Sequence, residues 1–214
     1  MKFTRAELES FRGATLPDLL PSPTKLLIVG INPGLLTVAV QAHFARRGNR
    51  FYPALFRAGI TDRLIDASQG FVPDDLHHLE HRGVGITCIV PGASARAADL
   101  SPHELRAGGA ALLDRIPTIG PHVVAFLGIS AYRVAFDELT AHVGRQPADL
   151  GSAEQWVVPN PSGLNAHATL DDLARAYRQV AVASGIEPYD RPADAGRAGS
   201  VTRARRAGAK ADRC

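Results

Sequence analysis

The sequence predicts an α/β fold built around a mostly parallel sheet. Short apolar runs that are typical of buried strands alternate with segments of helical spacing, and this alternation favours βαβ units. The runs span residues 25–30, 83–89, 122–127 and 155–159. With 45% apolar residues in a chain of 214, the protein can bury a sizeable core.

The expected helices follow from spacing and from start signals. Ser101 and Glu104 have the spacing of a capping box, and Pro102 stands at the first helical position, so a helix is predicted from there to about Ile116. Helices are also expected over residues 4–11, 51–57, 74–82, 129–139 and 169–185. Residues 31–50 are expected to form a polar loop.

The chain is predicted to form one domain, residues 1–187, followed by a basic tail, residues 188–214. The tail has seven Arg and Lys against three Asp, whereas the net charge of the whole chain is +3, so the rest is close to neutral. Because the tail has almost no large apolar residues, we expect it to be disordered. A nearly neutral domain gives little electrostatic evidence for a nucleic-acid partner.

Several classes of protein are excluded or disfavoured. No apolar run approaches the ~20 residues that span a bilayer, and the N-terminus lacks a signal-peptide core. We therefore expect a cytoplasmic protein without membrane contact. The two cysteines, Cys88 and Cys214, cannot form a four-cysteine metal or iron–sulfur site. The absence of a P-loop, a complete G-x-G-x-x-G and a G-x-S-x-G elbow argues against nucleotide hydrolases, Rossmann dehydrogenases and serine esterases. No cofactor is expected.

One metal motif needs separate treatment. His77-His78-Leu79-Glu80-His81 matches the inverted zinc-protease pattern H-x-x-E-H. The predicted helix is short, however, and no third ligand in a helical context follows it. We therefore interpret these residues as a solvated helix face and expect no metal.

Two Asn-Pro turns carry the functional signal. Gly30-Ile31-Asn32-Pro33-Gly34 and Asn160-Pro161-Ser162-Gly163-Leu164 each follow a predicted strand. In open parallel sheets, ligands bind beyond the carboxyl ends of the strands, so both turns could line one site. The Asn32 amide can orient a water or read a base edge, and the backbone N–H groups of the second turn suit phosphate oxygens. Either turn alone could be a plain loop, but together they indicate chemistry on a nucleotide.

With Gly48-Asn49-Arg50-Phe51 between them, these turns resemble the motifs of the mismatch-specific uracil/thymine-DNA glycosylases. This is the branch of the uracil-DNA glycosylase superfamily that has Asn in its first motif, and the resemblance spans residues 19–185. It implies a three-layer α/β/α sandwich. It also implies a monofunctional, monomeric repair enzyme that removes uracil, or thymine and modified pyrimidines, from double-stranded DNA with G·U or related mispairs.

The resemblance also implies roles for individual residues. Asn32 would position the hydrolytic water, the backbone around Ile31 and Gly34 would contact the base edge, and Phe44 would stack on the flipped base. Thr37 would replace a serine hydroxyl near the phosphate or sugar. Leu164 would fill the vacated base stack as a wedge. The remaining predicted DNA contacts are Asn160, Ser162, Gly163 and Asn165.

The sequence departs from the family in several places. Residues 35–38 are bulkier than the small residues of many relatives, and Ala166 stands where some carry Arg. Cys88 is given no catalytic role. Asp99 is either an auxiliary carboxylate or a solvated loop acid. Three arginines near Phe44 either meet incoming phosphates or are ordinary surface charge: Arg46, Arg47 and Arg50.

Two other functions stay open. The same scaffold could excise ethenocytosine, hypoxanthine or other damaged bases, depending on the pocket width near Leu36, Thr37 and Cys88. Alternatively, the chain could be a damage-binding module with little catalysis. A lyase step is not expected, because neither motif contains a lysine.

Overall fold

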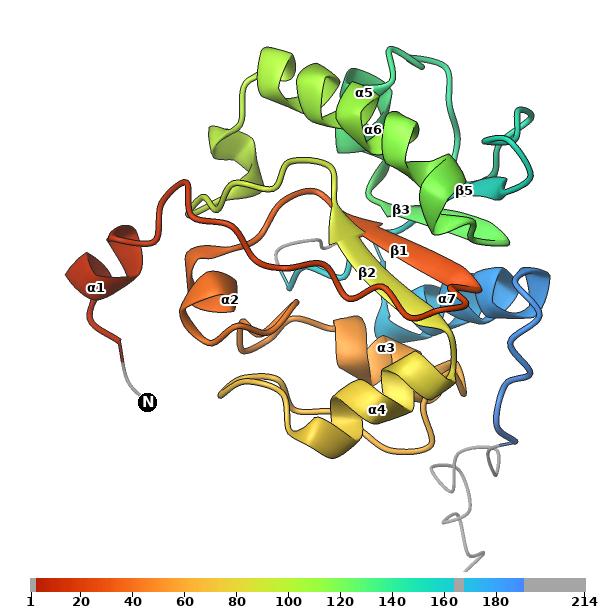
Figure 1. Ribbon diagram of the computed structural model, residues 1–214, viewed down its shortest axis with the longest axis horizontal. Helices are drawn as coiled ribbons and strands as arrows, with labels where there is room; N and C mark the ends of the chain where they lie inside the picture. The colour runs from red at the N-terminus through yellow and green to blue at the C-terminus, as the bar shows by residue number, and fades with distance from the viewer. Residues whose placement is uncertain (1–2, 164–167, 191–214) are drawn as a thin grey trace, which may run out of the picture.

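The computed structural model describes residues 3–163 and 168–190. Its centre is a five-stranded sheet of order β2-β1-β3-β5-β4 (Figure 1). Four strands run parallel: β1 (Leu26–Gly30), β2 (Val84–Cys88), β3 (Val123–Leu127) and β5 (Glu154–Val158). The short β4 (Gly144–Arg145) pairs antiparallel with β5. The predicted mostly parallel sheet is confirmed, whereas β4 was missed because two residues leave no periodic pattern.

Helices cover both faces of the sheet, which confirms the predicted α/β/α layering (Figure 1). On one face, α3 (Phe51–Arg57), α4 (Pro73–His81) and α7 (Leu170–Ala183) form one apolar core with the strands. On the other face, α5 (Pro102–Ile119) and α6 (Ile129–Ala135) form a second core. In β1, Leu26 and Ile28 belong to the first core, and Leu27 and Val29 to the second. Burial on both faces explains why the strands are continuous apolar runs.

The helix starts follow the capping signals. Capping boxes begin α1 (Arg5–Glu9) at Thr4, α5 at Ser101 and α7 at Thr169. Two predicted helix ends were wrong. Helix α5 continues to Ile119 and stops at Gly120, whose φ of 63° lies in the left-handed region. Helix α6 ends at Ala135 instead of residue 139.

The expected loop over residues 31–50 contains a helix, so that prediction was wrong. Helix α2 (Leu35–Ala39) follows the first Asn-Pro turn, and its residues Leu35, Thr37 and Val38 are buried. A five-residue helix is too short to show a clear apolar period, and its stability comes from tertiary packing. The bulky residues after Gly34 therefore serve as a packing surface. The sequence also did not predict a short 3₁₀ helix, η1, which spans Ala97–Asp99.

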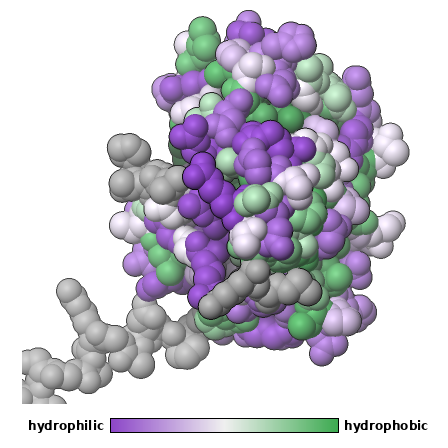
Figure 2. Space-filling model, turned by 90° about the vertical axis from the view of Figure 1, so that its left-hand side faces the viewer, coloured by the Kyte–Doolittle hydropathy of each residue, from purple (hydrophilic) through white to green (hydrophobic). Residues whose placement is uncertain are grey.

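The strand order creates a natural site for a ligand. From β1 the chain first adds β2 on one side and then β3 on the other, so the carboxyl end of β1 lies where the strand order reverses. Figure 2 shows the side of the molecule on which α1 and α2 lie in Figure 1, with strongly hydrophilic residues gathered along its centre. In the part of the chain that the structure describes, no helix has the length and apolar character needed to cross a membrane.

Candidate active site

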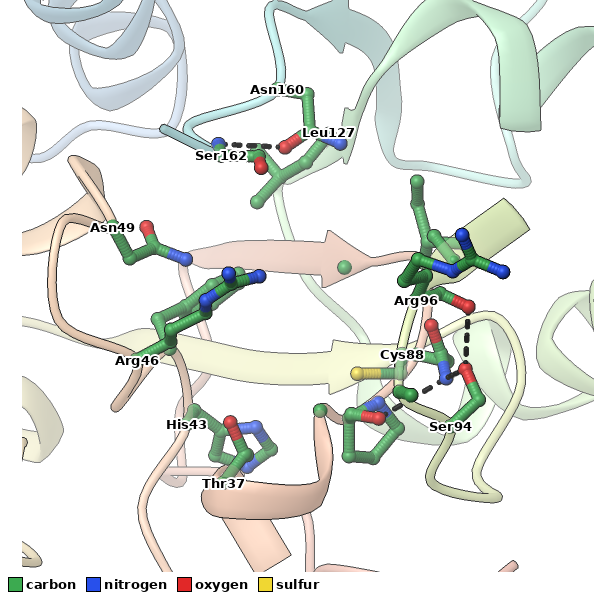
Figure 3. Close-up of a pocket in the computed structure, with 18 of the residues that line it drawn as sticks. Thr37, His43, Arg46, Asn49, Cys88, Ser94, Arg96, Leu127, Asn160 and Ser162 are labelled. Atoms are coloured by element: carbon green, nitrogen blue, oxygen red, sulfur yellow. Dashed lines mark hydrogen bonds between the residues drawn. The ribbon is translucent and has the colours of Figure 1, made fainter. Parts of the chain in front are cut away.

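A pocket of about 340 Å³ lies at the carboxyl ends of the four parallel strands (Figure 3). Its walls include residues 30–34 after β1, Cys88 at the end of β2, Leu127 at the end of β3, and Asn160 and Ser162 after β5. In Figure 3, Asn160 and Ser162 lie on the side of the pocket opposite Thr37 and His43. Two turns that are far apart in the sequence thus form one site.

The side chain of Asn32 is held in one orientation. Its Nδ2 atom donates hydrogen bonds to the carbonyl oxygens of Pro33 (3.1 Å) and Gly92 (3.2 Å) and to Ser94 Oγ (2.8 Å). No described residue donates to its Oδ1. Because the nitrogen is occupied by three acceptors and Asn32 lines the pocket, the oxygen is the atom left to accept a hydrogen bond from a ligand or water.

Ser94 fixes this orientation, and sequence reasoning missed it. Its hydroxyl donates to the carbonyl oxygen of Arg96 at 2.8 Å, so toward Asn32 it acts as an acceptor. The residue is only 6% exposed, and its backbone N–H donates to Pro33 O at 3.2 Å. Since 62 residues separate Asn32 from Ser94, no local pattern reveals the pairing.

Phe44 forms a flat wall of the pocket and is supported from behind. Its ring stacks on the fully buried Phe51, with centroids 3.9 Å apart and ring planes 26° apart. The backbone of Phe44 has φ of 55°, an uncommon value for a residue other than glycine. A Cβ on Gly30 would lie 3.3 Å from Cys88 Sγ and 3.4 Å from Phe44 Cζ. Glycine at position 30 therefore lets the ring and the thiol approach the strand end closely.

His43 and Cys88 are neutral groups in the pocket wall. Burial lowers the pKa of His43, and its Nε2 atom lies 3.0 Å from the carbonyl oxygen of Pro17, to which it donates. Desolvation raises the pKa of the Cys88 thiol to about 12, with a smaller contribution from the Asp18 carboxylate. Near pH 7 the part of the wall formed by these two side chains is uncharged, which suits an uncharged ligand group.

The raised pKa of Cys88 leads to a labelling prediction. Only the thiolate attacks iodoacetamide, and at pH 8 the folded protein holds Cys88 as the thiol. We expect Cys88 to react about a hundredfold or more slowly than in the urea-unfolded chain. Peptide mapping by mass spectrometry separates its adduct from that of Cys214. Equal rates in both states would show that the thiol is neither desolvated nor protected.

The second Asn-Pro turn is clamped to residues 48–50. Arg50 donates from its guanidinium to the carbonyl oxygens of Ser162 (3.0 Å) and Ala168, and from its backbone N–H to Pro161 O (3.0 Å). A Cβ on Gly163 would lie 2.7 Å from the carbonyl oxygen of Gly48, so a glycine is required at this contact. The sequence left open whether Arg50 meets phosphates or is ordinary surface charge, and the structure directs its guanidinium to loop carbonyls.

Removing this clamp should loosen the loop. Because hydrogen bonds from a charged group are worth roughly 1.5–3 kcal/mol each, we expect Arg50→Ala to lower the free energy of unfolding by about 2 kcal/mol or more. Urea titration measures this effect. Arg175→Ala is the matched control, since the exposed Arg175 makes a surface ion pair with Asp172 and should change stability by less than about 1 kcal/mol. Equal losses in the two variants would contradict the clamp.

Comparison with known proteins gives the family. The model of the uracil DNA glycosylase superfamily matches residues 17–182. The chain belongs to the uracil DNA glycosylase superfamily. The solution structure of a Methanosarcina acetivorans protein, provisionally named a uracil DNA glycosylase, shares the fold with a TM-score of 0.50 at 18% sequence identity. The match covers 79% of this chain and 98% of that one.

In this glycosylase, most residues that the sequence singled out lie together. The pocket is lined by Ile31, Asn32, Gly34, Thr37, Phe44, Asn160 and Ser162. Gly163 lies beside Gly48, next to this lining. Leu164, Asn165 and Ala166 fall outside the described residues. Leu36 does not line the pocket, whereas Thr37 and Cys88 do.

Charged residues near the glycosylase pocket differ in role. Arg46 lines the pocket, and so does Arg96, which the sequence did not single out; its side chain is 73% exposed. The two arginines lie on opposite sides of the pocket in Figure 3. Asp99 is not in the lining. It binds the guanidinium and backbone N–H of Arg96, which lower the pKa of its carboxyl.

The histidine motif is not a uniform solvated face, so that interpretation was wrong for one residue. His77 and His81 are exposed, but His78 is buried, lies 3.5 Å from Asp62 Oδ1 and stacks on Tyr189. Burial lowers the pKa of His78. No group of three His, Cys, Asp or Glu within residues 3–163 and 168–190 could hold a metal ion.

Proposed function

We propose that this superfamily member is a monofunctional, monomeric glycosylase that excises uracil, and thymine or modified pyrimidines, from mispaired double-stranded DNA. Superfamily membership supplies the DNA partner and the glycosylase class. The observation that carries the finer assignment is the orientation of Asn32, whose nitrogen is bound by three acceptors.

In the proposed reaction the target nucleotide leaves the duplex and enters the pocket. Flipping costs a few kcal/mol and costs least for a mispaired base, which favours mismatches. The base stacks on the free face of Phe44, whose other face rests on Phe51. The backbone of Ile31 and Gly34 meets the edge of the base, and the buried Thr37 meets the sugar side.

Asn32 Oδ1 accepts a hydrogen bond from the attacking water. The water oxygen forms a bond to C1′ as the bond from C1′ to the base nitrogen breaks, and the base leaves with the bonding electrons. The proton of the water passes to solvent, since a neutral amide accepts a hydrogen bond but not a proton. Rate enhancement then depends on positioning and electrostatics, which favours bases that leave easily.

DNA would be gripped by the second turn and by the arginines at the pocket. Asn160, Ser162 and Gly163 would contact the DNA backbone, Leu164 is the proposed wedge, and Asn165 is a further proposed DNA contact. Arg46 and Arg96 would meet phosphates on either side of the flipped nucleotide. Such contacts release counterions, so duplex affinity should fall as the salt concentration rises.

The test is a glycosylase assay on labelled duplexes. Substrates contain G·U, A·U, G·T, G·ethenocytosine or hypoxanthine, and alkali cuts the abasic sites that form. Excision from G·U ahead of A·U supports the proposal. Preference for ethenocytosine or hypoxanthine would move the substrate to other damaged bases. Tight binding without excision would make the protein a damage-binding module.

A further inference from the structure

Residues 4–16, here called the N-terminal arm, precede the part of the chain that matches the superfamily model, which starts at residue 17. The arm consists of α1, capped by Thr4, a hydrogen-bonded turn over residues 10–13, and a short stretch over residues 14–16 that runs along the loop after β2. None of its residues lines the base pocket. The arm therefore lies outside the matched residues and outside the pocket lining.

The arm binds the loop that holds Asn32. Gly13 N donates to Ala93 O at 2.8 Å, and Ala93 N donates to Ala14 O at 2.9 Å. Ala93 stands between Gly92 and Ser94, the two loop residues that accept hydrogen bonds from Asn32 Nδ2. The arm thus holds the middle of a three-residue segment whose two ends hold the Asn32 amide.

The arm also packs on the other side of the first turn. A small apolar cluster joins four arm residues to Leu35 and Val38 of α2 and to Ala93; the arm residues are Leu8, Phe11, Ala14 and Leu16. Helix α2 follows directly after Asn32-Pro33-Gly34. Both the segment after Asn32 and the loop that binds its side chain are therefore fastened to the same arm.

We propose that the N-terminal arm is a positioning element that keeps the Asn32 amide in its reactive orientation, a role that rests on the proposed function of Asn32. Detaching the arm should slow the chemical step without weakening DNA binding. Displacement of a positioned group by about 1 Å can cost on the order of a hundredfold in rate. We expect the excision rate to fall by between about tenfold and about a hundredfold.

The test uses Phe11→Ala in the full chain, with Leu8→Ala as a milder second variant. Arg5→Ala is the matched control, because Arg5 is an exposed residue of the same helix. Three quantities are compared: the single-turnover excision rate at saturating enzyme, the Kd for the duplex and the melting temperature. The expected result is a slower rate in both arm variants at an unchanged Kd, and no change in the control. A rate equal to wild type, or a loss that follows from weaker DNA binding, would overturn the proposal.

A double-mutant cycle of Phe11→Ala and Asn32→Ala separates an effect on the position of the Asn32 amide from a general loss of stability. If the arm acts through Asn32, Phe11→Ala slows the wild-type enzyme but leaves the residual rate of Asn32→Ala unchanged. Equal slowing in both backgrounds would contradict the role.

Hydrogen exchange at Ala93 N–H, which donates to the arm, is a readout that needs no activity. Faster exchange in Phe11→Ala is expected, and unchanged exchange would show that the arm does not hold the loop. If the wild-type chain shows no excision and Phe11→Ala still exchanges faster at Ala93, the proposed function is refuted, but the arm is shown to hold the Asn32 loop.

Discussion

Replacing Asn32 with alanine should lower the single-turnover excision rate by about a hundredfold or more while the mispaired duplex still binds. The variant removes the only acceptor proposed to hold the water, and loss of one positioned group at a reacting centre commonly costs on the order of 10²–10³ in rate. Duplex affinity should stay within about threefold, because the proposed phosphate contacts come from other residues.

The variant also leaves three acceptors of the Asn32 nitrogen without their donor: Pro33 O, Gly92 O and Ser94 Oγ. We therefore expect the free energy of unfolding to fall by about 1–3 kcal/mol. Rate, affinity and urea stability are measured on one preparation. Full excision activity in Asn32→Ala would remove the water-positioning role, whatever happened to stability.

Replacing Phe44 with alanine should give the second largest loss. Stacking of a base on an aromatic ring is worth about 1–3 kcal/mol, which corresponds to roughly 5- to 150-fold in the population of the flipped nucleotide. The fluorescence of 2-aminopurine placed next to the target base reports flipping, and the excision rate should fall with it.

Phe44→Leu is the control that separates stacking from packing. Leucine retains an apolar side chain against Phe51 but has no flat face. We expect Phe44→Leu to recover much of the melting temperature lost in Phe44→Ala and little of the excision rate. Recovery of the full rate by leucine would show that the ring only fills space beside Phe51.

The sequence predicted the parts of the site that are set by topology. Asn32 and Asn160 each follow an apolar strand, and parallel strands bring their carboxyl ends to one edge, so the meeting of the two turns could be expected. The sheet, its covering helices and the α5 start at Ser101 followed from local patterns. Leu164 and Asn165 lie outside the described residues, so their roles remain predictions.

Contacts between distant segments could not be predicted. Ser94 is one small polar residue in a loop, and only the fold brings its hydroxyl to Asn32. Arg50 reads as a surface cation, yet its guanidinium is directed to the carbonyls of the second turn. His78 reads as part of a polar helix, but α4 turns it toward Asp62 and Tyr189. In each case the role of the side chain depends on a partner that is distant in the sequence and is brought close only by folding.

The Arg50 clamp has a consequence for how the two motifs vary. Residues 48–50 lead into Phe51, which supports the Phe44 ring, while the guanidinium and the Gly48 carbonyl fix the loop with Ser162 and Gly163. The surface proposed to receive the base and the loop proposed to hold the DNA backbone are therefore coupled through these contacts. Substitutions on the two sides should be non-additive, and exchanging either motif alone for that of a relative should disturb both.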